Sequence, residues 1–363
     1  MSASLVGSEM CIRDRETKLV KIHQIEESLE EIEEAARLIQ QGEVVAFPTE
    51  TVYGLGGNGL MEEAVRKIYQ AKGRPSDNPL ILHISDIDMI EELTEDVPDT
   101  ARKAMECFWP GPMTVILKKS DKVPRCVTGG LETVAVRMPS DPTARELIRR
   151  AEVPIAAPSA NTSGRPSPTK AEHVWEDLNG KIPMILDGGP VKVGVESTII
   201  DFTVDPPVIL RPGRITREEL ENVIGCEVQM NTSLKASDKG VPKAPGMKYK
   251  HYAPKARMIL VLGSPEKTAA KINEMVCESH KLGHKAGVIA TDESLGAYQA
   301  DEVVSVGTRK NMETVMSGLY DVLRGFDKKD VDIIYSEGFE GEPLEEAVMN
   351  RLVKAAGHEI IRV

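Results

Sequence analysis

Apolar residues recur at helical spacing early in the chain and predict an amphipathic helix over residues 22–41. The apolar positions are Ile25, Leu29, Ile32, Ala36 and Ile39. Gly42 ends this pattern, and residues 44–47 (VVAF) then predict a buried strand that Pro48 closes. Residues 60–73 predict a second helix, because acidic residues begin it and lysines end it, as the helix dipole favours.

Short apolar segments then alternate with further helical patterns. We predict strands over residues 80–84, 113–117, 133–138, 153–159, 183–186, 197–202 and 207–210. Helical patterns lie around residues 99–108, 143–151, 170–178 and 216–222. This alternation predicts an α/β domain over residues 18–226, with a twisted mixed sheet covered by helices.

The composition changes between residues 227 and 256, where Asn, Thr, Ser, Lys, Gly and Pro dominate, as in a linker. Residues 257–363 return to alternating strand and helix patterns, which predict a smaller, doubly wound, Rossmann-like α/β domain. Its first turn, LGSPEKT, lacks a G-x-G-x-x-G fingerprint, so the pattern gives little support for a dinucleotide site there. Residues 1–15 match no secondary-structure period, and we treat them as a non-native or disordered tail.

Charge and cysteine content narrow the possible functions. The chain has 45 Lys and Arg against 57 Asp and Glu, a net charge of −12, so its surface repels polyanions and broad nucleic-acid binding is disfavoured. Any phosphate site must therefore be a local concentration of cations. The five cysteines include no close pair, which excludes zinc-knuckle spacing and fits a reducing cytoplasm. No apolar run approaches the roughly 20 residues that span a bilayer.

The segment AKGRPSDNPLILH (71–83) places two cations, Lys72 and Arg74, among glycine and prolines. If the chain runs extended after Gly73, both side chains point the same way, and converging cations repel each other unless an anion lies between them. A solvated pair at a helix end is the alternative, but the flanking prolines weigh against it. His83, in the strand that follows, is more often structural than functional when taken alone.

Two other loops carry polar side chains where strands end. PTETVYGLGG (48–57) offers hydroxyls and a carboxylate, followed by glycines that allow a ligand to approach the backbone closely. PSANTSGRPSPT (158–169) places Ser159 and Asn161 at a strand end, where open α/β folds bind ligands. An ordinary turn and a loop with a helix N-cap are the respective alternatives.

Arg137 lies inside the apolar segment TVAVRMP (133–139). A cation in such a strand is costly unless it is paired or faces an anion, and we favour a ligand slightly over an internal salt bridge. GVESTIID (194–201) and LRPGRIT (210–216) add further polar and cationic residues at strand ends. No G-x-S-x-G, H-E-x-x-H, Walker A or kinase signature is present.

Six segments, in this order along the chain, closely resemble the YrdC-type family. They are PTETVYGLGG, KGRPSDNPLILH, TVAVRMP, APSANTSGRPSPT, GVESTIIDF and LRPGRIT. The K-x-R and S-x-N pairs, Lys72/Arg74 and Ser159/Asn161, are that family's hallmark. The second domain and the PGMKYKHYAP segment are similar to the longer, two-domain threonylcarbamoyl-AMP synthases. The resemblance covers essentially residues 18–363, with no departure at the motif positions.

This resemblance implies a nucleotidyltransferase that converts L-threonine, bicarbonate and ATP into L-threonylcarbamoyl-adenylate, pyrophosphate and water. The product would serve threonylcarbamoyladenosine modification of tRNA. Mg²⁺ would arrive with ATP, without a dedicated metal site. We expect transient contact with the downstream proteins that transfer threonylcarbamoyl to tRNA, indirect or weak contact with tRNA, a cytoplasmic location and no membrane association.

The resemblance also implies residue roles. The implied catalytic residues are Lys72, Arg74, Ser159 and Asn161. The implied threonine pocket consists of Thr51, His83, Arg137, Ala157 and Ser197. The implied ATP site consists of Arg74, Asn78, Thr133, Ser159, Ser167, Arg211 and Tyr252. Within the linker, His251 and Tyr252 would form a lid over the nucleotide.

The main alternative is an RNA-binding module of the same fold without synthase activity. It predicts tight, salt-dependent tRNA binding without ATP, and the net charge of −12 argues against it. A hydrolase of carbamoyl- or acyl-adenylates, or a carbamoyltransfer domain like that of hydrogenase maturation proteins, is a further alternative.

Overall fold

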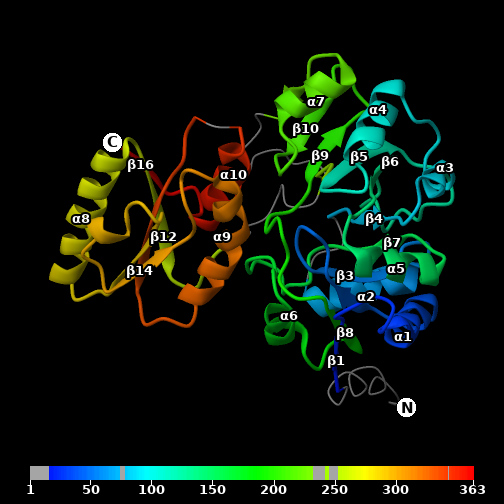
Figure 1. The fold of residues 1–363 in the computed structure, drawn as a ribbon, viewed down its shortest axis with the longest axis horizontal. Helices are drawn as coiled ribbons and strands as arrows, with labels where there is room; N and C mark the ends of the chain where they lie inside the picture. The colour runs from blue at the N-terminus through cyan, green and yellow to red at the C-terminus, as the bar shows by residue number, and fades with distance from the viewer. Residues whose placement is uncertain (1–15, 74–77, 232–241, 245–251, 342) are drawn as a thin grey trace, which may run out of the picture.

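The computed structural model describes residues 16–73, 78–231, 242–244, 252–341 and 343–363. Two α/β domains lie side by side, each built around its own sheet (Figure 1). Among the predicted site residues, Arg74 and His251 lie outside the described part of the chain.

The first domain is built on a mixed sheet of 11 strands. In spatial order they are β1 (Lys18–Lys21), β8 (Met184–Asp187), β2 (Val45–Phe47), β3 (Gly54–Asn58), β7 (Ile155–Ala156), β4 (Ile81–His83), β6 (Thr133–Arg137), β5 (Met113–Lys118), β9 (Thr198–Asp201), β10 (Val208–Arg211) and β11 (Gln229–Met230). Strand β6 pairs in parallel with β4 and antiparallel with β5, so the predicted mixed sheet is confirmed.

Helices cover this sheet on both faces. They are α1 (Leu29–Gln40), α2 (Glu62–Lys72), the 3₁₀ turn η1 (Ile87–Met89), α3 (Ile90–Leu93), α4 (Asp99–Phe108), α5 (Pro142–Ala151), α6 (Ala171–Leu178) and α7 (Arg217–Ile224). Strand β2 shows the two-sided burial directly, because Ala46 joins one apolar cluster while its neighbours Val45 and Phe47 join another.

Two local predictions need correction. The helix predicted from residue 22 begins at Leu29, and strand β1 precedes it. Local periodicity did not indicate β1, because this strand forms by pairing with β8, more than 160 residues later. The strand predicted over residues 153–159 is only Ile155–Ala156, since Pro154 and Pro158 on either side have no N–H to donate to a sheet.

The second domain is a parallel sheet of five strands, in the order β14 (Glu302–Ser305), β13 (Ala286–Ala290), β15 (Ile333–Glu337), β12 (Arg257–Leu262) and β16 (Ile360–Arg362). Its helices are α8 (Pro265–Lys281), η2 (Leu295–Ala297), α9 (Met312–Phe326) and α10 (Glu345–Ala355). The doubly wound fold is confirmed, with β15 inserted between β13 and β12, which distinguishes the strand order from that of the dinucleotide-binding Rossmann fold. Helices α9 and α10 face the first domain, while α8 lies on the far side (Figure 1).

One apolar cluster spans both domains. Val52 and Val195 of the first domain, together with Tyr252 at the end of the linker, pack with the buried face of α9. The aromatic rings of Tyr252 and Tyr320 lie with their centroids 5.1 Å apart. The second domain therefore covers loops of the first domain with a shared core.

Candidate functional site

A narrow cavity of about 60 Å³ opens where several strands and loops of the first domain meet the linker. Its lining residues are Thr49, Thr51, Val52, Gly54, Ile81, His83, Arg137, Ala157, Pro158, Ser159, Asn161, Ser167, Glu196, Arg211 and Tyr252. These residues come from the six segments singled out in the sequence, and from the linker. Strand pairing explains part of the gathering, because His83 at the end of β4 is the register partner of Arg137 at the end of β6.

Arg137 is buried, with 4% of its surface exposed. One Nη donates to Thr51 Oγ1 at 2.9 Å, and the other lies 2.7 Å from Glu50 Oε1 as an ion pair without hydrogen-bond alignment. Arg137 therefore has an internal carboxylate partner and also lines the cavity, while its predicted contact with a ligand stays a prediction. The guanidinium fork could still receive a carboxylate ligand.

His83 is buried between Arg137 and aromatic surface, with the ring of Phe47 in edge contact. Burial, and then the nearby Arg137 cation, lower the pKa of His83 to about 3. The imidazole is therefore neutral at physiological pH and can offer a hydrogen bond but no charge.

Lys72, Ser159 and Asn161 form a compact polar group at one wall of the cavity. Lys72 is 2% exposed at the end of α2, and its ammonium donates to the backbone oxygens of Ser159 and Asn161, the second at 2.6 Å. Ser159 Oγ donates to Asn161 Oδ1 at 2.5 Å. The ammonium is thus held by two backbone carbonyl groups and links α2 to the 158–169 loop, while the anion predicted beside Lys72 stays a prediction.

Glu196, which we did not predict as a site residue, is a buried carboxylate in the lining of the cavity. It accepts hydrogen bonds from Ser167 at 2.6 Å and from Tyr320 of α9 at 2.9 and 3.0 Å, and it pairs with Arg351 of α10 at 3.1 Å. Burial alone would raise its pKa, but Arg351 and then Arg211 outweigh that effect and lower the pKa of Glu196 to about 2. Its place in GVESTIID, just before a buried strand, was the available signal.

The remaining predicted residues lie at different distances from the cavity. Arg211 lines it and donates to the backbone oxygen and hydroxyl of Ser197, each at 3.1 Å, so Ser197 lies directly behind the lining. Asn78 is fully buried but does not line the cavity, and its backbone oxygen accepts a hydrogen bond from the Tyr69 hydroxyl. Thr133 begins β6, four residues from Arg137, or about 13 Å along an extended strand.

The described residues hold neither a group of metal ligands nor a helix that could span a membrane. Within it, no three His, Cys, Asp or Glu side chains are grouped as metal ligands would be. No helix formed by these residues is both apolar enough and long enough to cross a bilayer.

Fold and cavity together define a two-domain α/β protein whose first domain holds a cavity lined by Arg137 and Arg211 and by Tyr252 of the linker. Two family models match the chain. One, described as "Telomere recombination" and covering Sua5, YciO and YrdC, matches residues 37–213. The other, "Threonylcarbamoyl-AMP synthase, C-terminal domain", matches residues 215–357.

Curated relatives and solved structures agree with these models. The chain is 53% identical to the threonylcarbamoyl-AMP synthase of Bacillus subtilis over 92% of this chain and 94% of the relative. It is 50% identical to that of Pyrococcus abyssi over 93% and 98%, respectively. The crystal structure of P. abyssi Sua5 with L-threonine superposes with a TM-score of 0.89 at 49% identity, covering 96% of this chain and 99% of that one. The chain belongs to the two-domain, Sua5-type threonylcarbamoyl-AMP synthase family.

Proposed function

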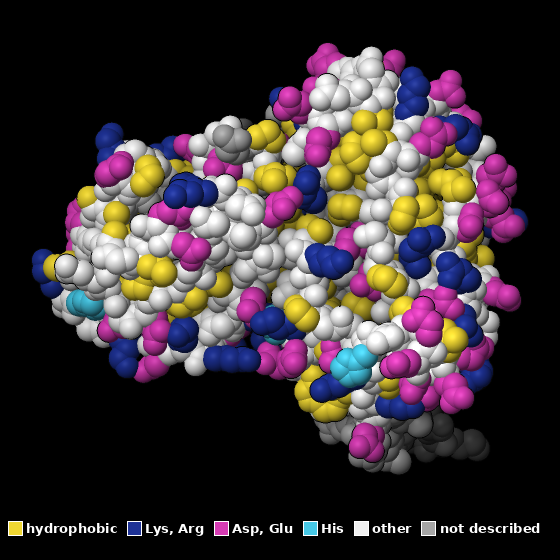
Figure 2. Space-filling view, in the orientation of Figure 1, with side chains coloured by type: hydrophobic (Ala, Val, Ile, Leu, Met, Phe, Trp, Pro, Cys, Tyr) yellow, Lys and Arg dark blue, Asp and Glu magenta, His cyan; other side chains and the backbone are white. Residues whose placement is uncertain are grey.

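We propose that this chain condenses L-threonine, bicarbonate and ATP into L-threonylcarbamoyl-adenylate, with release of pyrophosphate and water. The relatives that carry the synthase name match both domains, which favours this function over an RNA-binding module of the same fold. Lys, Arg, Asp and Glu side chains are also interspersed over the face seen in Figure 2, as expected for a surface without a broad polyanion site.

The observation that carries the proposal is the meeting of four predicted threonine-site residues in one cavity. Arg137 would receive the threonine carboxylate, while Thr51 and His83 offer neutral polar groups and Ala157 a small apolar wall. The relative crystallised with L-threonine gives independent support for an amino-acid ligand.

The other wall suits a nucleotide. Ser159, Asn161, Ser167 and Arg211 line it, and we place the phosphates along this side, where the Lys72 ammonium contacts Ser159 and Asn161. The ATP-binding role implied for Arg74 falls outside the described residues. The threonine amine would take up bicarbonate as a carbamate, whose oxygen then attacks the α-phosphorus of ATP. Such a displacement needs positioned reactants and stabilised charge rather than a protein nucleophile.

Tyr252 is the residue best placed to close the site. It is 4% exposed, lines the cavity and packs against Tyr320, while burial raises its pKa to about 12, so the hydroxyl stays protonated. The cavity is far smaller than the roughly 300 Å³ or more of typical ligand pockets, so substrates require its walls to move. We propose that Tyr252, with His251, opens for entry and then excludes water from the labile carbamate and adenylate.

We further propose that Mg²⁺ enters on the triphosphate and keeps several of its waters. The product would pass to the proteins that complete tRNA modification through transient contacts in the cytoplasm, with indirect or weak contact to tRNA itself.

The direct test is pyrophosphate release by the purified full chain with ATP and Mg²⁺. We expect release only when both L-threonine and bicarbonate are present. Release that needs neither substrate, or no release with both, would contradict the function.

A further inference from the structure

Two arginines of the second domain are fully buried against loops of the first. Arg351 of α10 reaches Glu196, and Arg324 of α9 reaches Asp177 at the end of α6, with 1% of the Arg324 surface exposed. A buried ion pair of this kind adds little to the free energy of unfolding, because the cost of desolvating the two charges offsets their attraction. The geometry around Arg324 indicates another purpose.

The Arg324 guanidinium makes two kinds of contact at once. Its Nη1 and Nη2 donate to the two carboxylate oxygens of Asp177 at 3.2 and 3.0 Å. Its Nε and Nη2 also donate to the backbone oxygen of Pro166 at 3.1 and 2.7 Å. One side chain of the second domain thus fixes both α6 and the 158–169 loop.

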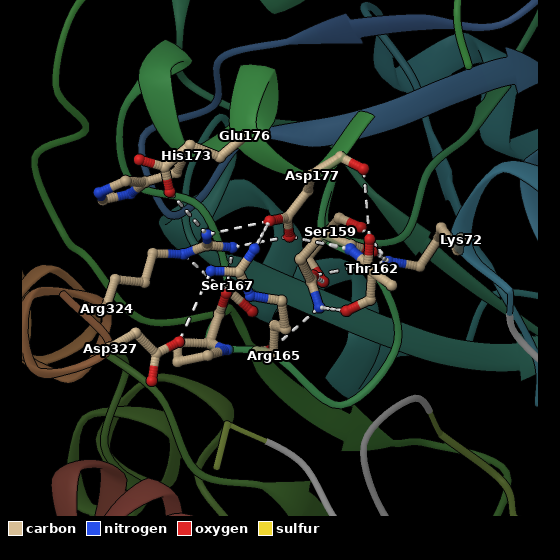
Figure 3. A network of polar contacts seen from close by, with 12 residues as sticks. Lys72, Ser159, Thr162, Arg165, Ser167, His173, Glu176, Asp177, Arg324 and Asp327 are labelled. Carbon is tan, nitrogen blue, oxygen red and sulfur yellow. Dashed lines mark hydrogen bonds and ion pairs between the residues drawn. The ribbon is translucent and has the colours of Figure 1, made fainter. Parts of the chain in front are cut away.

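Asp177, which Arg324 holds, is itself hydrogen-bonded to the 158–169 loop. Its carboxylate accepts from the backbone N–H of Thr162 at 3.0 Å and from the guanidinium of Arg165. Figure 3 shows these groups between Arg324 and Lys72, with Asp177 at the centre. Arg165 also lies 3.6 Å from Asp327, at the end of α9, so the second domain reaches the loop from two points.

The loop then shapes the polar group at the cavity wall. Asn161 Nδ2 donates to the backbone oxygens of Thr162 and Arg165 at 2.9 and 3.0 Å, which fixes the amide and turns its Oδ1 toward Ser159. The backbone oxygen of Asn161 holds the Lys72 ammonium at 2.6 Å. Hydrogen bonds joined through Thr162 and Arg165 of the loop therefore connect Arg324 to three of the predicted catalytic residues.

We propose that Arg324 is a positioning residue for catalysis, which makes the geometry of Lys72, Ser159 and Asn161 depend on the docked second domain. The proposal rests on the proposed function, because turnover is its readout. It assigns the second domain a role at the reacting groups that is separate from any closure by Tyr252.

The test compares Arg324→Met with Lys328→Met in the full chain. Both changes remove a cation near the end of α9 that pairs with Glu176, at 2.6 Å for Lys328 and 3.9 Å for Arg324. Lys328 is exposed, whereas Arg324 is buried and also donates to Asp177 and Pro166. Kinetics of threonine-dependent pyrophosphate release are combined with hydrogen exchange of residues 159–167. A misplacement of about 1 Å can cost a hundredfold in rate.

For Arg324→Met we expect kcat to fall about 10- to 100-fold. The KM for threonine should stay within about twofold, because the contacts of Arg137, Thr51 and His83 are made away from the Asp177 network. Exchange in residues 159–167 should accelerate while helix α5 keeps its protection. Lys328→Met should match the wild type in all three measurements.

Wild-type kcat in Arg324→Met would overturn the proposal, as would a reduced kcat with unchanged exchange in the loop. If that variant fails to fold, Arg324→Lys serves, since a lysine keeps the charge but cannot span Asp177 and Pro166 together. It should retain an intermediate kcat, and a wild-type value would equally overturn the role. Failure of the wild type to release pyrophosphate contradicts the proposed function instead, so the two failures are distinguishable.

Discussion

Arg137 has an internal carboxylate partner and is also proposed to bind a substrate carboxylate, and substitution can separate these two roles. Its buried ion pair with Glu50 would compensate the arginine charge inside the fold, and its place in the cavity lining would allow it to bind a substrate carboxylate. Removal of one partner of a buried pair leaves the other charge uncompensated, so a single substitution confuses the two roles.

We expect Arg137→Met to lower kcat/KM for threonine about 10- to 100-fold, since a charge-assisted hydrogen bond contributes about 1.5–3 kcal/mol. The melting temperature should also fall. The double variant Arg137→Met/Glu50→Gln should recover part of that stability, because no carboxylate remains unpaired, but none of the activity. Recovery of activity in the double variant would mean that Arg137 serves only in the internal salt bridge, the alternative that the sequence left open.

A second prediction concerns the protonation state of the His83 imidazole. Because burial and Arg137 hold its pKa at about 3, the ring stays neutral as the pH falls from 8 to 5, where an ordinary histidine would become charged. We expect its ring-proton NMR shifts to stay constant over that range. The KM for threonine should accordingly show no inflection near pH 6.5. A titration midpoint above pH 5 would contradict this environment.

At the scale of elements, the loops between strands depend on close contact with α9. Gly194, just before Glu196, has a φ of +83°, and a Cβ there would lie 2.4 Å from the Cα of Ser317 and 2.5 Å from the backbone oxygen of Met316. Both the backbone conformation and the space therefore require glycine. A side chain at this position would push the second domain away from the cavity.

We expect Gly194→Ala to lower the free energy of unfolding by about 1–3 kcal/mol more than Gly189→Ala does. Gly189 is a matched control, because it has the same φ of +83° but nothing within 4 Å of the point where an alanine methyl group would lie. Denaturant unfolding of the two variants measures the difference. Equal losses would mean that contact with α9 adds nothing to the cost of the backbone conformation.

Elements and individual residues differed in how far the sequence predicted them. Helix α2 followed from its local pattern and charge distribution, because the causes lie within the segment. Strand β1 and the contacts of Glu196 with Tyr320 and Arg351 depend on partners more than 100 residues away, which local patterns do not encode. The sequence grouped Lys72 with the 158–169 loop, but the carbonyl partners of its ammonium could be seen only in the folded chain.

In the whole molecule, the second domain provides hydrogen-bond donors for two buried carboxylates of the first domain. Arg351 and Tyr320 donate to Glu196, and Arg324 donates to Asp177, all from α9 and α10. Deletion of the chain after Gly225 would strip these partners from buried carboxylates, in addition to removing Tyr252. Point substitutions therefore test the lid more cleanly than truncation.

The Glu196 carboxylate makes this docking depend on pH. Its pKa is about 2 in the folded protein and near 4.5 ordinarily, so its stabilising effect is complete above pH 4.5 and is lost as the pH falls toward 2. We expect Glu196→Gln to be less stable than the wild type at pH 7, with the difference shrinking below pH 4.5. Thermal unfolding from pH 7 to pH 3 measures it, and a difference independent of pH would contradict the assigned pairing.

We propose that one cavity joins threonine, a carbon from bicarbonate, and AMP. The most direct measurement is mass spectrometry of the adenylate formed from ¹³C-bicarbonate, L-threonine, ATP and Mg²⁺. We expect one labelled carbon in each adenylate molecule that carries threonine, and no such adenylate when threonine is omitted. A threonine adenylate without the labelled carbon, or the absence of any threonine-containing adenylate, would contradict it.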